Sequence, residues 1–492
     1  MSAGARRDTQ PWAGRGGPGA SSGVSGVGKF GVRAPGPIRF RTGFRNTIYD
    51  VLLARGWQEV GGQDDPVWDF NWCDPSWMHN NFDGAVLAEW QKVNHFRNHY
   101  ELTQKACLLK NLKRAQKQLR KEGKEEEAAK YDFHPTSYLL PQEWGLFIEE
   151  FKRSGVAANL AAKKGAKEAA AAAAAAGTAE KAEDEVGDQL NVWIMKPTGS
   201  AQGKGIFLCT KLQQVQDWRK GANWRPSHMT TSLGGGDGKG REGEEEGRVE
   251  NYVAQRYIEN PMLIGGRKFD LRIYVLVLSY NPLRVYVNRS GFARFSMSRF
   301  TMNKDQVGNN LIHLTNVAIQ KKGPQYSKNV GMKWPLNNLK VHCQAKYGAA
   351  KADELFADIE GVIIRSLMAV QPIIINDKHS FEMYGYDVLI DSNLKPWLVE
   401  VNASPSLSAD TKADYENKCE VLSDMLDVVD MEGRFGGQLP EQVGGFDLIW
   451  DGGPVDRGRK SSLPTLLGCA NDRDKQLRRL ATAAAPPARA AA

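Results

Sequence analysis

The sequence predicts an α/β (α+β) fold with several domains. Three observations predict it: strand-like apolar runs in the second half of the chain, one long amphipathic helix at Leu355–Val370, and low-complexity stretches between the folded parts. The chain has 492 residues, of which 41% are apolar, so it can bury a substantial core. Length alone would allow roughly two to four domains.

Changes in composition set the predicted domain boundaries. Residues 1–38 are rich in Gly, Ala, Ser and Pro and cannot offset their ordering entropy by burial, so we expect disorder there. Two further low-complexity stretches, 155–188 with an alanine run and 221–248 with many Gly and Glu, are predicted to be exposed insertions. The predicted organisation is a disordered segment 1–38, an N-terminal α/β domain 39–100, a central domain 101–256 that contains both insertions, a C-terminal domain 257–435, and a largely irregular tail 436–492.

The N-terminal domain is predicted from one helix and one strand, and a basic helix pair follows it. Thr47–Arg55 has helical apolar spacing, and Trp68–Trp72 has the composition of a short strand. His95–Arg120 is predicted to form the helix pair. Residues 92–124 contain ten Lys and Arg but only two Glu, so the charge of this segment, +8, equals the net charge of the whole chain. Such a patch suits nucleic acid, a phospholipid surface or an acidic peptide, although a solvated helix face also explains it.

The cysteines and the hydropathy pattern indicate the compartment. Six cysteines are scattered without a CxxC pair, which is typical of reduced thiols in a cytosolic protein. No apolar run approaches the roughly 20 residues that a membrane helix needs, and the N-terminus lacks a signal-peptide core. We therefore expect an intracellular protein without membrane insertion. There is no GxSxG nucleophile elbow between a strand and a helix and no HExxH motif, so serine hydrolase and zincin functions have no support.

In the central domain, a lysine precedes a glycine-rich loop. Lys196 follows the apolar strand Val192–Met195, and the loop contains Gly199, Gly203 and Gly205 before a second strand. Glycines let a backbone approach phosphate oxygens closely, and a lysine adds a positive charge. The loop is not a Walker motif, because strands bracket it. A plain β-turn is the alternative interpretation.

In the C-terminal domain, a strand within Arg267–Leu278 carries three charges. Lys268, Asp270 and Arg272 alternate with apolar residues that face the core, so they share one side of the strand. These charges need partners, and a structural ion-pair ladder is the alternative to a binding role.

Three shorter motifs could add ligand contacts. Gln255–Ile258 ends an apolar strand, where backbone groups can meet an adenine edge. Arg289 could add a further cation. His313–Asn316 has a hydroxyl and an amide that suit ligand contact, although a turn cap explains these residues equally well.

A β-hairpin is predicted near the end of the C-terminal domain. Two apolar runs, Tyr386–Ile390 and Trp397–Val401, flank the polar connection Ser392–Lys395. We expect this four-residue connection to place Asp391 opposite Pro396, and the rest of the register follows from that pair.

This register brings three oxygen donors together. Asp387 then faces Glu400, and Asn402 lies on the same face as Glu400 because side chains alternate along a strand. Two carboxylates and an amide oxygen suit Mg²⁺, which usually leaves positions for nucleotide phosphates. An acidic hairpin that faces solvent is the alternative.

Together these motifs resemble a known family. A lysine before a Gly-rich loop between strands, a nucleotide edge, cationic strands and a D…E-x-N hairpin resemble the ATP-grasp arrangement of a ligase core. The wording WIMKP…GKGI, QRYI, GGRKFDLR, HLTN and YGYD…WLVEVNASPS is similar to the tubulin tyrosine ligase-like family. RTGFRNTIYDVLLARGW and HFRNHYELTQKACLLKNLKR resemble its polyglutamylase branch. The loop residues Thr198–Ala201 do not match the family's sequence motif closely.

The resemblance implies roles for the matching residues. The implied Mg²⁺ ligands are Asp387, Glu400 and Asn402. The implied catalytic cations around the γ-phosphate and the reacting carboxylates are Arg272, Arg289 and Lys105. The implied nucleotide contacts are Lys196, Gln202, Gly203, Lys204, Gly205, Ile206, Gln255, Arg256, Tyr257, Ile258, Lys268, Asp270, Thr315 and Asn316.

The resemblance also implies a function. It implies a ligase with ATP and Mg²⁺ as cofactors that adds glutamate to glutamate side chains of tubulin C-terminal tails through an acyl-phosphate. The implied partners are microtubules, free glutamate and accessory subunits, with no nucleic acid, and the implied place is the cytoskeleton of a cilium or flagellum, at the axoneme and basal body. Ligation of glycine or tyrosine, or a non-catalytic microtubule-binding scaffold, remain alternatives. Loss of a metal ligand would favour the scaffold, and none is lost.

Overall fold

The computed structural model describes residues 36–61, 67–157, 190–199, 203–220, 251–323, 333–403, 405–409, 411–455 and 463–483. Nearly all of the predicted disordered segment and of the two predicted insertions lies outside these ranges, as does Gln202. Ile38, at the end of the segment expected to be disordered, is instead buried in the N-terminal core. The described strands form three sheets, and the predicted α/β (α+β) class is confirmed.

The N-terminal sheet has the order β2-β1-β3-β4, with parallel neighbours. Its strands are β1 (Arg39–Thr42), β2 (Gln58–Glu59), β3 (Phe70–Trp72) and β4 (Lys92–Val93). The predicted helix is α1 (Thr47–Ala54), which begins where the Asn46 side chain accepts a hydrogen bond from the Ile48 N–H. Its apolar side faces the core because Ile48 and Leu52 lie four residues apart on one helix face.

A nine-stranded sheet is built around β10 (Arg267–Tyr280). One edge of β10 pairs with β14, which pairs with β15; the other edge pairs with β12 and then β11 along its length. The other strands extend the sheet from β12, β11 and the start of β10. The bounds are β9 (Leu263–Ile264), β11 (Leu283–Asn288), β12 (Phe292–Phe295), β13 (Lys333–Pro335), β14 (Glu382–Ile390), β15 (Pro396–Ala403), β16 (Gln442–Val443) and β17 (Phe446–Asp451).

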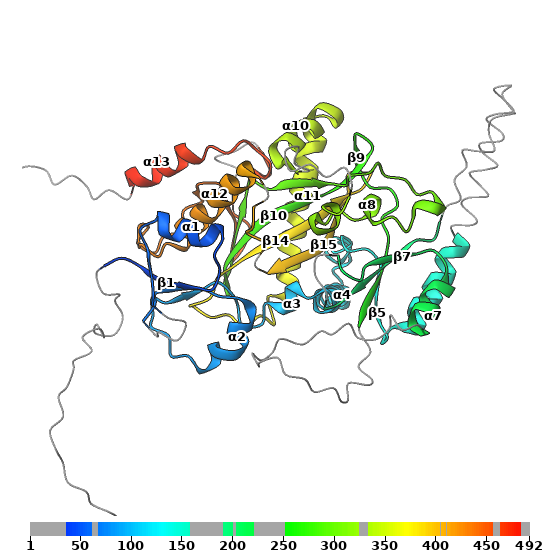
Figure 1. The fold of residues 1–492 in the computed structure, drawn as a ribbon, viewed down its shortest axis with the longest axis horizontal. Helices are drawn as coiled ribbons and strands as arrows, with labels where there is room; N and C mark the ends of the chain where they lie inside the picture. The colour runs from blue at the N-terminus through cyan, green and yellow to red at the C-terminus, as the bar shows by residue number, and fades with distance from the viewer. Residues whose placement is uncertain are drawn as a thin grey trace, which may run out of the picture.

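Helices cover both faces of this sheet. The predicted amphipathic helix is α11 (Ala349–Val370), and it packs on Ile273 and Val275 of β10. On the opposite face, Tyr274 packs in the same apolar core as residues of α12 (Lys412–Val429) and α1. Successive side chains of β10 point alternately into two apolar cores. Near the start of the strand, one face instead carries the charged residues Lys268, Asp270 and Arg272. Figure 1 shows β10, β14 and β15 near the middle of the molecule, with α1 and α12 on one side.

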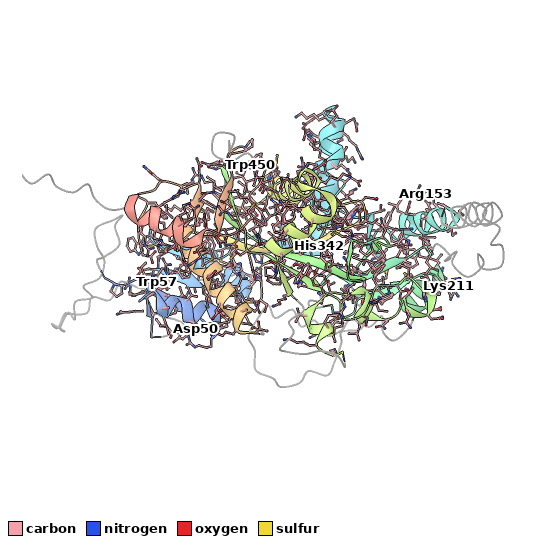
Figure 2. The ribbon with its side chains drawn as sticks, turned by 90° about the horizontal axis from the view of Figure 1, so that it is seen from above. Asp50, Trp57, Arg153, Lys211, His342 and Trp450 are labelled. Atoms are coloured by element: carbon pink, nitrogen blue, oxygen red, sulfur yellow. The ribbon has the colours of Figure 1, made fainter. Side chains whose placement is uncertain are left out.

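A second four-stranded sheet has the order β5-β8-β6-β7, with antiparallel neighbours. Its strands are β5 (Ser137–Leu140), β6 (Trp193–Pro197), β7 (Phe207–Cys209) and β8 (Tyr252–Arg256). Its core surrounds Trp193, with aromatic side chains from the helical residues 144–157. Figure 2 shows Arg153 and Lys211, beside this sheet, at one end of the molecule, and Asp50 and Trp57 at the opposite end.

Short helices connect these parts. The remaining helices are α2 (Pro75–Asn81), η1 (Phe82–Gly84), α3 (Tyr100–Thr103), α4 (Lys105–Lys121), α5 (Glu125–Ala129), α7 (Leu212–Lys220), η3 (Lys304–Gln306), α8 (Asn310–His313), α9 (Val317–Gln320), α10 (Leu336–Tyr347) and α13 (Arg473–Ala483). The predicted helix pair corresponds to α3 and α4, and α4 packs against α11. No helix within the described ranges is both long enough and apolar enough to cross a membrane.

Two sequence predictions differ from the structure. The tail 436–492, expected to be largely irregular, contains α13 and two strands of the large sheet, because Phe446 and Leu448 of β17 fill the core beside α12. In the hairpin, Ile390 rather than Asp391 lies opposite Pro396. A β-bulge at Val399 then shifts the register by one residue and restores the predicted Asp387–Glu400 pair.

Candidate active site

A cavity lies between the β5-β8-β6-β7 sheet and the first half of β10 with its neighbours β14 and β15. Apolar side chains from both sides, Ile194, Leu314 and Leu389 among them, contribute to its lining. The site residues predicted from the sequence that line this cavity are Lys105, Lys196, Gly203, Ile206, Gln255, Arg256, Tyr257, Ile258, Lys268, Asp270, Thr315, Asn316, Asp387 and Glu400. Residues up to 295 positions apart therefore meet at one place, since Lys105 and Glu400 are an ion pair at 3.4 Å.

Asp387 of the hairpin is almost completely buried. It is 1% exposed, and Arg272 Nε donates to its Oδ1 at 2.6 Å, while Arg294 lies 2.7 Å from Oδ2. Burial disfavours the carboxylate, but the charges and hydrogen bonds of the two arginines outweigh it and lower the pKa of Asp387 to about 2. The acid is therefore ionised at neutral pH.

Glu400 and Asn402 complete the oxygen donor set. Lys105 Nζ lies 3.4 Å from Glu400 Oε2. Asn402 Nδ2 donates to the Gly385 carbonyl at 3.2 Å and lies 3.5 Å from Glu400 Oε1. Two carboxylates and an amide on paired strands are the hard oxygen ligands that Mg²⁺ prefers, so these residues fit that ion.

Two buried lysines point into the cavity from different sheets. Lys196 Nζ donates to Gln255 Oε1 at 2.6 Å, and Lys268 Nζ donates to the Tyr257 hydroxyl at 2.9 Å. Burial lowers the pKa of Lys196 to about 8 and that of Lys268 to about 7. A bound phosphate would stabilise both ammonium groups, because an opposite charge raises the pKa of a lysine.

The glycine-rich loop closes on the opposite wall. Gly203 has φ +79°, and a Cβ there would lie 2.5 Å from Ile319 Cδ1 and 3.3 Å from Asn316 Oδ1. Only glycine permits this backbone angle together with this close approach. The loop residue Ile206 joins Ile194, Tyr257 and Leu314 in an apolar cluster. Apolar side chains beside two lysines are the kinds of residue that contact a purine base and its phosphates.

Some predicted residues lie outside the cavity lining. Arg272 lies next to the cavity because it donates a hydrogen bond to Asp387. Asn402 lies next to it because its Nδ2 is 3.5 Å from Glu400 Oε1. Lys204 is exposed, and Gly205 packs against Pro197. Arg289 is separate: its Nε and Nη2 each lie 2.5 Å from a carboxylate oxygen of Asp447 on β17.

Arg289 instead lines a neighbouring cavity of about 680 Å³. This cavity shares Thr315 and the Arg294 side chain with the surroundings of Asp387. Its charged lining comprises Arg289, Arg294, Lys333 and Asp414. We refer to it as the second cavity.

Arg294 is the site residue that sequence reasoning missed. It lies on β12 directly opposite Asp270 in the register, and its guanidinium bridges the carboxylates of Asp270 and Asp387. Burial opposes its charge, but the two acids raise the pKa of Arg294 well above its usual value. The signal in the sequence is an arginine within the short run Phe292–Phe295. A strand of four residues is too short to be recognised by its alternating pattern.

Comparisons with known proteins show the family to which the chain belongs. Residues 85–434 match the model of the tubulin-tyrosine ligase family. The chain is 46% identical over 464 residues to the probable tubulin polyglutamylase TTLL9 of Bos taurus, covering 90% of this chain and 92% of the relative. It is 41% identical to the probable tubulin polyglutamylase ttll-9 of Caenorhabditis elegans, covering 84% of each chain. It is 40% identical to the probable alpha-tubulin polyglutamylase Ttll1 of Tetrahymena thermophila, covering 84% of this chain and 93% of the relative.

The family match includes the hairpin, the cationic strand β10 and the lysine of β6, so it spans every wall of the cavity. The predicted family resemblance is thereby confirmed. This chain is a ligase with an ATP-grasp-like fold, and it belongs to the tubulin-tyrosine ligase family.

Proposed function

We propose that the protein is an ATP-dependent tubulin polyglutamylase, which ligates glutamate to glutamate side chains of tubulin C-terminal tails. The observation that carries this proposal is the single cavity that joins the oxygen donors Asp387 and Glu400 to the lysines Lys196 and Lys268. The similarity to relatives named polyglutamylases, over at least 84% of this chain, supports the same activity.

The cavity residues divide into a nucleotide part and a metal part. Lys196, Lys268 and the loop from Gly203 to Ile206 are proposed to hold the phosphates of ATP, with the adenine beside Gln255–Ile258. Asp387, Glu400 and Asn402 are proposed to hold Mg²⁺. The bound ion supplies positive charge that neutralises the triphosphate during phosphoryl transfer.

The chemistry needs no protein nucleophile. A carboxylate of the tubulin tail attacks the γ-phosphorus of ATP, and ADP leaves, which forms an acyl-phosphate. The amine of free glutamate then attacks the acyl carbon, phosphate leaves, and the amine loses a proton. Arg272 and Arg294 flank Asp387, where they can stabilise the charge that develops on the transferred group, and Lys105 can orient the substrate carboxylate.

The second cavity suits the amino-acid donor. An acidic amino acid carries two carboxylates and one ammonium, and this cavity offers Arg289, Arg294 and Lys333 beside Asp414. These charges favour glutamate over glycine, because glycine lacks the second carboxylate. In this proposal Arg289 binds donor and not nucleotide, with its orientation fixed by Asp447.

The exposed face of α4 suits the acidic tail of tubulin. Lys110, Lys117 and Lys121 are exposed on this helix, which starts at the cavity residue Lys105. We propose microtubules as the partner and the cytoskeleton, at the axoneme and basal body of a cilium or flagellum, as the place of action. Accessory subunits are a further proposed partner.

Mass spectrometry of tubulin tails tests the proposal. Tubulin is incubated with the protein, ATP and Mg²⁺, and with glutamate, glycine or tyrosine in separate reactions. Glutamate adducts on tail glutamates are expected, with far less glycine or tyrosine addition. Equal addition of glycine would assign a glycine ligase. No addition of any amino acid, with retained binding to microtubules, would assign a non-catalytic scaffold.

A further inference from the structure

Gln255 connects Lys196 to a partly buried histidine, His134. Gln255 Oε1 accepts from Lys196 Nζ at 2.6 Å, and Gln255 Nε2 lies 3.2 Å from His134 Nε2 and donates to Ser137 Oγ at 3.0 Å. His134 Nδ1 lies 3.1 Å from the Pro135 carbonyl, which can only accept, so Nδ1 carries the ring proton. His134 Nε2 is then an acceptor, and the Gln255 amide is held with its oxygen toward the lysine.

Tyr257 connects Lys268 to a second histidine in the same way. His313 Nε2 lies 3.1 Å from the Gln306 carbonyl, so Nε2 carries the proton and Nδ1 accepts. The Tyr257 hydroxyl, 3.0 Å from His313 Nδ1, therefore donates to the ring and accepts from Lys268 Nζ at 2.9 Å. Lys268 also donates to the His313 carbonyl at 2.8 Å, which leaves one N–H for a ligand.

The two arrangements share a design. Gln255 and Tyr257 are two positions apart, both are buried, and each lies between a lysine and a histidine. The histidines come from different elements, the segment before β5 and the end of α8. Burial, with the nearby lysine charges, lowers the pKa of His134 to about 3 and that of His313 to about 4, so both rings stay neutral and can accept.

We propose that His134 and His313 are positioning residues for the nucleotide: each orients the acceptor of one cavity lysine and so aims that ammonium group at the phosphates. Without the His134 acceptor, Ser137 Oγ alone holds the Gln255 NH₂ away from Lys196, so the amide is less firmly oriented. Without the His313 acceptor, the Tyr257 hydroxyl proton is free to turn toward Lys268. A turned amide or a turned hydroxyl opposes the ammonium group. This inference rests on the proposed function only in taking the cavity as the ATP site.

The test measures MgATP binding to the full chain by calorimetry, and KM for ATP and for glutamate where ligation is seen. His134→Leu and His313→Leu remove the ring acceptors. Each is expected to weaken ATP binding about tenfold, because the ammonium group of one lysine loses a firmly oriented acceptor. The KM for glutamate is expected to stay unchanged. His134→Gln and His313→Asn, which can return an acceptor near the lost ring nitrogen, are expected to restore most of the affinity.

Double variants separate positioning from a general structural role. In a Tyr257→Phe background, His313→Leu is expected to cost little further ATP affinity, and the same holds for His134→Leu in a Gln255→Leu background. His379→Leu is the matched control, since His379 is buried like His313, and its ring contacts a backbone carbonyl, that of Gln91, outside the cavity. Its ATP affinity is expected to match wild type.

Three outcomes would overturn the inference. They are full additivity in the double variants, an equal rise of KM for ATP and glutamate, and an ATP affinity of the histidine variants equal to that of the control. A wild-type chain that binds ATP but ligates no glutamate would overturn the proposed ligase alone, because the binding comparison stands without it. A wild-type chain that binds no ATP would overturn both.

Discussion

At the scale of single residues, the site is a network of compensated charges. Arg272 and Arg294 neutralise Asp387, and Arg294 also reaches Asp270. A buried ion pair stabilises little by itself, but removal of one partner leaves an uncompensated buried charge. A substitution within this buried network therefore affects both chemistry and folding, and the two effects need separate measurements.

Glu400→Gln is expected to abolish ligation while the melting temperature stays near that of wild type. The change removes one metal-ligand charge from a partly exposed side chain, and the apolar residues of β15 are untouched. Ligation assays and thermal unfolding check this. Glu354→Gln, at an exposed position of α11, is the control and should keep full activity. Comparable ligation by Glu400→Gln would contradict the metal assignment.

Arg294→Met is expected to destabilise the protein by about 3–5 kcal/mol, because it leaves two buried carboxylates short of a partner. Arg294→Lys keeps a charge but cannot bond both acids as a planar guanidinium does, so it should fold and lose most activity. Denaturant unfolding and ligation rates measure the two effects. Arg299→Met, an exposed neighbour, should change neither. An active Arg294→Lys enzyme would count against a role in charge stabilisation.

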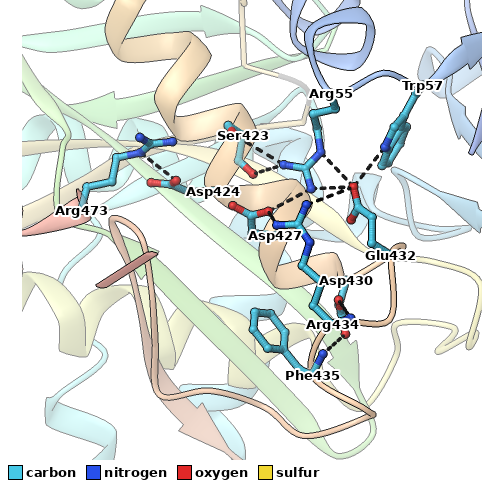
Figure 3. Close-up of polar contacts among 10 residues, drawn as sticks. All are labelled: Arg55, Trp57, Ser423, Asp424, Asp427, Asp430, Glu432, Arg434, Phe435 and Arg473. Atoms are coloured by element: carbon cyan, nitrogen blue, oxygen red, sulfur yellow. Dashed lines mark hydrogen bonds and ion pairs between the residues drawn. The ribbon is translucent and has the colours of Figure 1, made fainter. Parts of the chain in front are cut away.

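At the scale of elements, α12 connects the N-terminal domain to the end of the chain. Figure 3 shows Arg55, which follows α1, bound to Asp427 at 2.9 Å and to Glu432 at 2.7 Å, and Trp57 bound to the same Glu432 carboxylate. One turn away, Asp424 pairs with Arg473 of α13 at 2.9 Å. The bonds from Arg55 and Trp57 join segments that are more than 350 residues apart in the sequence, whereas Asp424 and Arg473 are 49 residues apart.

Asp424 is expected to make stability depend on pH. Burial raises the pKa of Asp424 to about 7 despite Arg473, whereas an unfolded Asp titrates at about 3.9. Between these values the folded state binds more protons than the unfolded state, so its stability falls as pH rises from about 4 to about 7.

Asp424→Asn removes this titration and keeps an oxygen for the Gly445 N–H. The melting temperature of wild type minus that of Asp424→Asn should therefore decrease between pH 5 and pH 8. Asp472→Asn, at an exposed position, is the control and should follow the wild-type profile. Parallel profiles of wild type and Asp424→Asn would refute the assignment.

The basic face of α4 is expected to steer tubulin binding. Reversal of Lys110, Lys117 and Lys121 to Glu should weaken microtubule co-sedimentation and make the remaining binding less sensitive to salt than that of wild type, since exposed charges act over about 10 Å at 0.1 M salt and the variant lacks the attraction that salt screens. ATP affinity should stay at the wild-type value. Lys113 and Arg114 are unsuitable targets, because they also bind Glu143 and the Ala369 carbonyl. Unchanged binding across a salt series would assign this face to solvent.

At the scale of the whole molecule, the cavity joins two sheets. Lys196 and Gln255 come from the β5-β8-β6-β7 sheet, whereas Asp270 and Asp387 come from the nine-stranded sheet. A nucleotide bound between them would tie the two sheets together, and anything that binds only the folded state raises its stability.

MgATP is accordingly expected to raise the melting temperature of the wild-type chain. At a concentration 100 times the dissociation constant, the stabilisation would be about 2.7 kcal/mol. Glu400→Gln should show a smaller rise, and ATP without Mg²⁺ should show a smaller rise in wild type. Scanning calorimetry measures all three. Equal stabilisation with and without Mg²⁺ would remove the metal from the nucleotide site.

Much of the site could be predicted from the sequence, because its signals are local. The alternation of apolar residues in β14 and β15 predicted that Asp387 faces Glu400, and the strand before Lys196 predicted where that lysine lies. Side-chain direction in a strand repeats every two residues, so a short stretch suffices. The turn was predicted one residue wrong, and the bulge at Val399 compensated for it at the site.

Only the tertiary structure decided which arginine reaches Asp387. Arg289 and Arg294 are five residues apart, and nothing local separates them. The pairing of β12 with β10 places Arg294 against Asp270, while Arg289 is held by Asp447 of β17, a strand expected to be irregular. Strand partners are chosen by burial of surfaces that are distant in sequence, and a charged side chain takes whichever partner that packing brings within reach.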